Sequence, residues 1–273
     1  MSSAHWKEGV LLKFVNVVAY FFFLESNIYT IVSPEPIYGN IKQTYFTPAI
    51  WAFLVWPVIH SLLLGTVIYQ FTSAHAKAVV VDGISWGFPL LTISYAIFVI
   101  VWANHNHTIA FVLALFLFYI ACNVSWTLKK DHPPKSMGDQ LFVHLPFSMW
   151  LAWTAVIVFL TAFEAFGVDA TRDRDGGWTD FLVFLALLVL QIFAAACSRS
   201  PIEADRPAAF VISWTMWAIF DYQRSSAFIH GAAVTFSTLS LIWVFIAVDR
   251  CYRRLTGGHT VLTSEERRPL LGR

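Results

Sequence analysis

The apolar segment from Tyr45 to Phe71 holds the residue types best suited to ligand chemistry. Its two tryptophans, Trp51 and Trp56, offer flat apolar faces on which a planar molecule can stack. Near its middle, His60 could ligate haem iron, hydrogen-bond a polar group of a ligand, or bond a neighbouring carbonyl or serine within the protein. Pro57 predicts a kink, which would open a gap for a ligand or for a neighbouring helix.

The elements that carry these residues are predicted to cross a membrane. Hydrophobic residues make up 58% of the chain and charged residues 13%, against about 25% charged in soluble domains, and the mean hydropathy is +0.63. We expect an all-α polytopic membrane protein of about eight transmembrane helices. The predicted spans are Val10–Val32, Pro48–Phe71, Ser85–Ala103, Thr108–Thr127, Leu141–Ala165, Trp178–Ala196, Pro207–Phe220 and Ser226–Val248.

The positive charges predict the orientation of these spans. With eight spans, 14 of the 18 lysines and arginines fall on the side that holds both termini. Cytoplasmic loops carry an excess of lysine and arginine, so both termini are predicted to be cytoplasmic. The formal net charge of +1 gives no indication of a nucleic-acid surface.

Few polar groups lie inside the predicted spans. Glu25 and Asn27 lie in the first span, where a buried carboxyl would be expected to pair or to stay protonated. Glu164 is assigned to an acidic, solvated loop together with Asp169. The sequence contains no recognisable catalytic motif and no metal-ligand pattern, so neither an enzyme nor a metal site is predicted.

Two motifs resemble those of one known family. In the second span, Thr47-Pro48 is followed by an aromatic series, Gly65 and Tyr69; the fifth span carries LPFSMWLAWT from Leu145 to Thr154. Both resemble the TspO/MBR family, the translocator or tryptophan-rich sensory proteins, and most closely an extended eight-helix branch in fungi and bacteria. The resemblance implies a five-helix unit over residues 1–166, three further transmembrane helices over 167–250 and a cytoplasmic tail over 251–273.

The resemblance also implies a function, namely a receptor or sensor that binds a porphyrin, haem or sterol in an aromatic-lined helical cavity. No cofactor is certain. The implied ligand-binding residues are Trp51, Trp56, His60, Phe147, Trp150 and Trp153. The alternative is that these tryptophans anchor and pack the helices, as most of the 12 tryptophans are expected to do. A small-solute transporter or channel, and a non-catalytic scaffold, also stay open.

The tail and the family together indicate partners and a location. Glu266, Leu270 and Leu271 fit an acidic dileucine pattern that resembles endosomal and vacuolar sorting signals. Such a signal is read by a cytoplasmic sorting adaptor, which favours the endomembrane system or vacuole over mitochondria and the plasma membrane. Besides the lipid membrane and a hydrophobic small molecule, a homodimer is an open partner, since dimers are known in the family.

Overall fold

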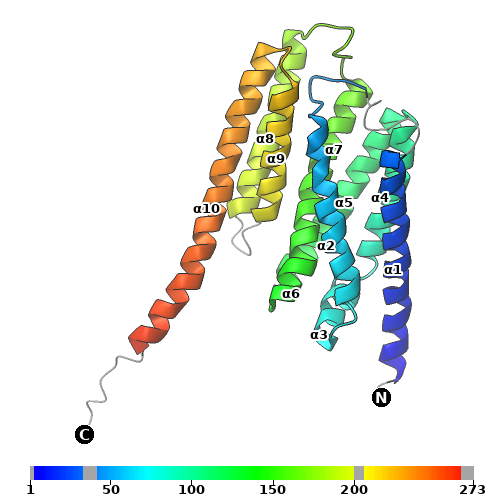
Figure 1. Cartoon of the computed structure of the whole chain (residues 1–273), viewed down its shortest axis with the longest axis vertical. Coiled ribbons are helices and arrows are strands. Elements are labelled where there is room, and N and C mark those ends of the chain that lie inside the picture. The colour runs from blue at the N-terminus through cyan, green and yellow to red at the C-terminus, as the bar shows by residue number, and fades with distance from the viewer. Residues whose placement is uncertain (1–2, 33–41, 200–205, 266–273) are drawn as a thin grey trace.

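The computed structural model describes residues 3–32, 42–199 and 206–265, and every regular element in these ranges is helical (Figure 1). Eight long helices form the bundle, and short helical turns join them. The long helices are α1 (Ser3–Val32), α2 (Val55–Tyr69), α4 (Gly87–Ala103), α5 (His107–Asp131), α7 (Leu145–Phe166), α8 (Gly177–Arg199), α9 (Arg206–Tyr222) and α10 (Ala227–Glu265). The short ones are η2 (Ile50–Leu54), α3 (Ala74–Lys77), η3 (Ala78–Ile84), α6 (Met137–Asp139) and η4 (Gln140–His144).

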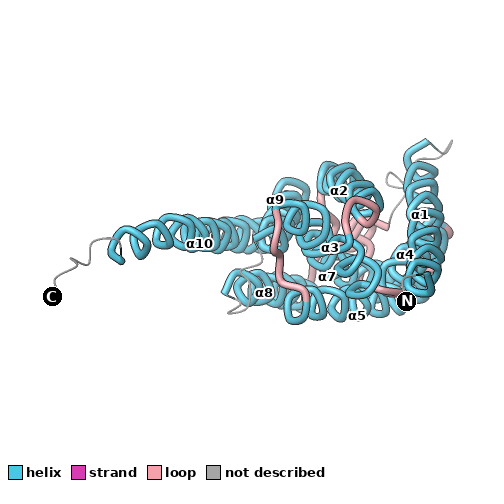
Figure 2. Tube along the Cα trace, turned by 90° about the horizontal axis from the view of Figure 1, so that it is seen from below, coloured by secondary structure: helices cyan, strands magenta, loops and turns pink. Residues whose placement is uncertain are grey.

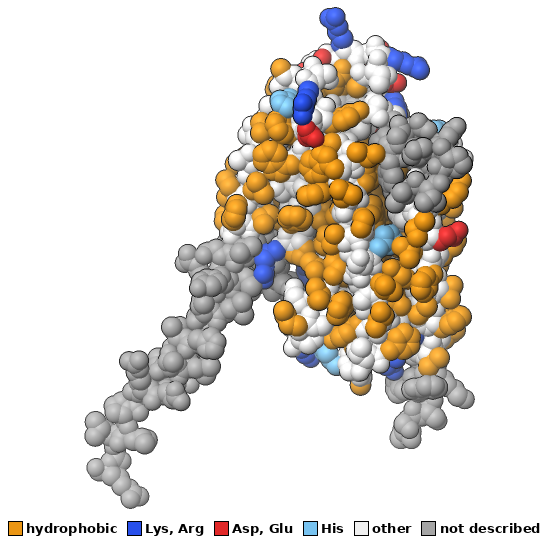
Figure 3. Space-filling model, in the orientation of Figure 1, with side chains coloured by type: hydrophobic (Ala, Val, Ile, Leu, Met, Phe, Trp, Pro, Cys, Tyr) orange, Lys and Arg blue, Asp and Glu red, His pale blue; other side chains and the backbone are white. Residues whose placement is uncertain are grey.

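The prediction of an all-α polytopic membrane fold is confirmed. Within the described ranges, six helices are long and apolar enough to cross a membrane, and a seventh span is added if the bent pair Ala74–Ile84 and Gly87–Ala103 is one unit. Each of the eight predicted spans corresponds to a long helix, but α9, with 17 residues, lies at the lower limit for spanning a bilayer. Apolar side chains cover most of the face seen in Figure 3, as expected for contact with lipid tails.

Helix α7 lies at the centre of the packing. It contacts α5, α9 and α2. The candidate span Met137–Phe166, which consists mostly of α7, is 78% buried over its 18-residue apolar window, whereas the other five single-helix candidate spans are buried over less than half of theirs. Helix α1 packs mainly against α4, and α10 packs against α8 and α9. Figures 1 and 2 both show α10 continuing well past the neighbouring helices.

The second span changes its helix type just before Pro57. A 3₁₀ turn, η2, precedes the α-helix, which begins at Val55. Pro57 therefore falls in the first helical turn, where its missing N–H breaks no intrahelical bond. Pro48, which the sequence placed in the first turn of the span, lies before η2 and outside the helix.

Candidate functional site

Three of the predicted ligand-binding tryptophans lie together in an aromatic core. The ring centroid of Trp56 lies 6.4 Å from that of Trp150 and 6.1 Å from that of Trp153. Phe23 stacks on Trp150 at 5.0 Å, and the indole N–H of Trp153 donates to the Tyr95 hydroxyl over 3.3 Å. Tryptophans from α2 and α7 thus meet aromatic residues of α1 and α4.

This aromatic core is filled by its own side chains. Trp150 is fully buried and Trp153 is 1% exposed. The space bounded by Trp56, Tyr95 and Trp153 has a volume of about 10 Å³, at the limit of what one water molecule occupies. Phe147 is buried beside Trp150, 6.3 Å away between ring centroids. The aromatic cavity implied by the family resemblance is therefore closed by packing in this structure.

Trp51 faces a different neighbour. Its indole N–H donates to Asp221 Oδ2 over 3.0 Å, and its ring packs edge-on against Trp214 at 4.8 Å. Both partners belong to α9. The hydrogen bond from Trp51 is the main cause that lowers the pKa of the Asp221 carboxyl, and the hydrogen bond from Arg224 is the next largest. The structure thus separates Trp51 from the other predicted ligand-binding residues and uses it to join η2 to α9.

An open groove lies between α1 and the second span, and it contains two of the predicted polar residues. We call it the ligand groove. Its volume is about 380 Å³, and its lining residues are Leu24, Asn27, Ile28, Ile50, Phe53, Leu54, Trp56, Pro57 and His60. Small-molecule sites typically have volumes of about 300–1,000 Å³ and mostly apolar linings with a few placed polar groups. Both the size and the composition of the groove fall within this pattern.

His60 and Asn27 supply the polar groups of the groove. His60 is 8% exposed, and neither of its ring nitrogens has a hydrogen-bond partner among the described residues. Its ring lies 4.6 Å from that of Phe23 and 5.5 Å from that of Trp56, between centroids. Asn27 donates to the Phe23 carbonyl over 3.0 Å, while its own Oδ1 is buried without a partner. Unpaired buried polar atoms are costly, and both residues that carry these three atoms line the groove.

The remaining predicted residues lie outside this groove. Glu25 is exposed on α1 and does not line it. The sorting pattern of Glu266, Leu270 and Leu271 falls outside the described residues. Among the residues that the structure describes, no group of three or more histidine, cysteine or acidic side chains is arranged to hold a metal ion.

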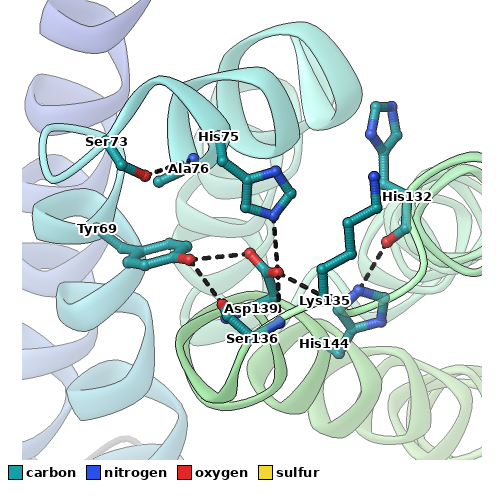
Figure 4. A network of polar contacts seen from close by, with 9 residues as sticks. All are labelled: Tyr69, Ser73, His75, Ala76, His132, Lys135, Ser136, Asp139 and His144. Carbon is teal, nitrogen blue, oxygen red and sulfur yellow. Dashed lines mark hydrogen bonds and ion pairs between the residues drawn. The ribbon is translucent and has the colours of Figure 1, made fainter.

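Sequence reasoning missed a polar network at one end of the bundle (Figure 4). The buried carboxylate of Asp139 accepts hydrogen bonds from Tyr69 and His75, both over 2.9 Å, and from the backbone N–H groups of Lys135 and Ser136, both over 3.0 Å. It ties α2, α3 and the start of the α6–η4–α7 segment together. The Ser136-x-x-Asp139 spacing is a capping-box pattern that could have revealed part of it.

Glu164 was assigned to a solvated loop, and that prediction is wrong. Glu164 lies in the last turn of α7 and is only 1% exposed. The indole N–H of Trp102 donates to its Oε2 over 2.6 Å, and His107 Nδ1 lies 3.5 Å from the same oxygen. Helix α7 ends at Phe166, one residue beyond the predicted apolar span. Glu164 therefore still lies on the helix, where its carboxyl meets Trp102 of α4 and His107 of α5.

Comparison with known proteins agrees with the sequence motifs and the fold. A family model described as "TSPO-like protein" matches residues 11–248, from within α1 to within α10. No curated protein matches the chain, and no solved structure does. The match covers well over half of the 273 residues, and the apolar helices provide the membrane-spanning segments that such a protein needs. The chain is therefore an integral membrane protein that belongs to the TSPO-like family.

Proposed function

We propose that the protein is a membrane receptor that binds a hydrophobic small molecule in the ligand groove. The observation that carries this proposal is a mostly apolar lining that includes two residues with unpaired polar atoms, His60 and Asn27. A ligand with an apolar body and one neutral hydrogen-bonding head would satisfy both features. The apolar body would fill the groove, and the head would form hydrogen bonds with the His60 imidazole and the Asn27 amide oxygen.

The lining favours a sterol over a porphyrin or haem. The two propionates of a protoporphyrin need cationic or multiple donor partners when they leave water, and none of the lining residues is a lysine or arginine. The unpaired His60 nitrogens would suit haem iron, but the same lack of cations leaves the propionates unpaired. A single hydroxyl, which both donates and accepts, matches a neutral imidazole and an amide oxygen.

The groove opens toward the side of the bundle, which supports access from the bilayer. Its rim includes the strongly exposed Ile50 and Leu54, at 65% and 60%, and Ile28, at 48%. These apolar side chains would face lipid tails in a membrane. A lipid-soluble ligand could therefore enter sideways without passing through water.

The test is saturation binding of a radiolabelled sterol to the purified protein in lipid nanodiscs, with protoporphyrin IX and haemin as competitors. We expect saturable sterol binding that Asn27→Leu weakens by about threefold to tenfold, the value of one hydrogen bond. Asn123→Leu is the matched control, because Asn123 is exposed and bonds only the Tyr119 carbonyl of its own turn. Non-saturable sterol binding, or equal binding by both variants, would contradict the proposal.

For the orientation, we propose that both chain ends face the cytoplasm, in an endomembrane or vacuolar membrane. The first turn of α1 and the last turn of α10 lie at the same end of the bundle (Figure 1), which supports a common side for both. The excess of lysine and arginine on that side supports a cytoplasmic location. Protease protection of tags at each end, in sealed vesicles, tests the orientation.

A further inference from the structure

A second apolar groove separates α7 from α8, and we call it the seam groove. Its volume is about 310 Å³, and its lining residues are Phe159, Ala162, Phe163, Phe166, Gly167, Leu182, Leu185, Ala186 and Val189. Helices α7 and α8 contact each other little, because α8 packs mainly on α9 and α10 while α7 packs on α9 and α5. Helix α8 therefore joins the rest of the bundle mainly through α9, and the seam groove remains open between α8 and α7.

The seam groove has the dimensions of one lipid chain within one leaflet. Phe159 to Gly167 spans eight helical steps, about 12 Å along the axis, and half of the hydrocarbon core measures about 15 Å. Every lining residue is apolar or glycine, and three of the wall residues, Leu182, Leu185 and Val189, are each 41% exposed toward the outside. An acyl chain lying parallel to the helices would restore the contacts that an unfilled gap forfeits.

A cation lies at the end of this groove. Lys42 Nζ donates to the carbonyl oxygens of Gly167 and Glu164, each over 2.9 Å, and Gly167 is itself part of the lining. An ammonium group has three N–H donors, so these two bonds leave one. The nearby Asp169 carboxylate accepts from the Thr171 hydroxyl over 2.6 Å and from the Thr171 backbone over 2.9 Å, so it has partners of its own.

We infer that the seam groove binds one acyl chain of a glycerophospholipid, whose phosphate pairs with Lys42. The apolar channel holds the chain, and the ammonium at its end meets the headgroup where the hydrocarbon region stops. The bound lipid fills the space between α7 and α8 and so joins α8 to the rest of the bundle. This site is independent of the ligand groove, which lies between α1 and the second span.

The experiment is native mass spectrometry of the full chain after delipidation and incubation with phosphatidylglycerol. Diacylglycerol with the same chains is the headgroup-free probe. We expect wild type to retain one phosphatidylglycerol and to retain diacylglycerol about fivefold less, the loss of one lysine–phosphate attraction. Ala162→Phe, which places a ring in the groove, should abolish retention of both. Ala196→Phe is the matched control, because Ala196 is exposed on α8 outside the groove.

The headgroup contact is tested separately. Lys42→Gln should reduce phosphatidylglycerol retention to the diacylglycerol level, Lys42→Arg should preserve it, and Arg172→Gln should leave it unchanged, because Arg172 pairs with Asp169 at the surface. If Ala162→Phe does not fold, Val189→Trp fills the groove from its rim. Equal retention by the groove-filling variant and by Ala196→Phe would overturn the site, and equal retention of the two lipids would overturn the role of Lys42.

Discussion

Replacing His60 with phenylalanine should stabilise the ligand-free protein and weaken its binding of a sterol. A neutral imidazole carries one N–H donor and one acceptor nitrogen, and both His60 nitrogens are buried without a partner in the described structure. Each unpaired buried polar group costs about 1–3 kcal/mol. Phenylalanine keeps a ring beside Phe23 and Trp56, at centroid distances that are now 4.6 and 5.5 Å, and removes both polar atoms.

The size of the two effects follows from these contacts. We expect His60→Phe to raise the free energy of unfolding by about 1–3 kcal/mol, since the packing stays and the unpaired nitrogens disappear. The same substitution removes a hydrogen bond to the ligand head, so sterol affinity should fall by about threefold to tenfold. Stability and affinity should therefore change in opposite directions, which is the pattern expected of a binding residue.

The assay pairs thermal unfolding of the sterol-free protein in detergent with sterol binding in nanodiscs. His144→Phe is the control, because His144 is also buried but its Nε2 lies 3.0 Å from the His132 carbonyl oxygen. That variant should be less stable than wild type and should bind the sterol normally. If His60→Phe also lowers the stability, the His60 nitrogens have partners in the folded protein and the argument for the ligand groove fails.

Three further variants test the packing and the polar contacts. Gly65→Ala should destabilise the protein by about 1–3 kcal/mol, because a Cβ there would overlap the ring of Phe142. In a Phe142→Ala background the same change should be neutral or stabilising, as a double-mutant cycle by thermal unfolding would show. Asp139→Ala should cost about 2 kcal/mol or more, because it leaves four donors without their acceptor, and limited proteolysis should then cut near residue 136 faster than in wild type. The pKa of Asp221 is lowered in the folded state, so its stabilising effect is present above about pH 4 and is lost as the pH falls through the folded pKa; Asp221→Asn should reduce the pH dependence of unfolding below pH 4, and an unchanged acid transition would contradict the Trp51 contact.

Much of the architecture could be predicted from local sequence pattern. Runs of about 20 apolar residues can only be helices in a bilayer, since every backbone N–H and C=O must be satisfied within the segment. The eight predicted spans therefore correspond to the eight long helices, and the motifs beginning at Thr47 and Leu145 were enough to suggest the family.

The partners of each side chain depended on contacts between distant parts of the chain. Trp51 meets Asp221, 170 residues later, and no periodicity within the second span could indicate which helix lies opposite that face. Likewise, whether Trp150 and Trp153 surround a cavity or fill it depends on Phe23 and Tyr95, which come from two other helices.

The polar residues show the same division. The sequence marked His60 and Asn27 as unusual, because polar groups inside an apolar span need a reason, but only the helix packing left their atoms unpaired beside an open groove. Glu164 was taken for a loop residue because charges usually mark the end of a span, whereas Trp102 and His107 bury it in the folded protein. Local pattern thus determined the helices and the membrane, while burial and pairing were decided by helices that the chain brings together only on folding.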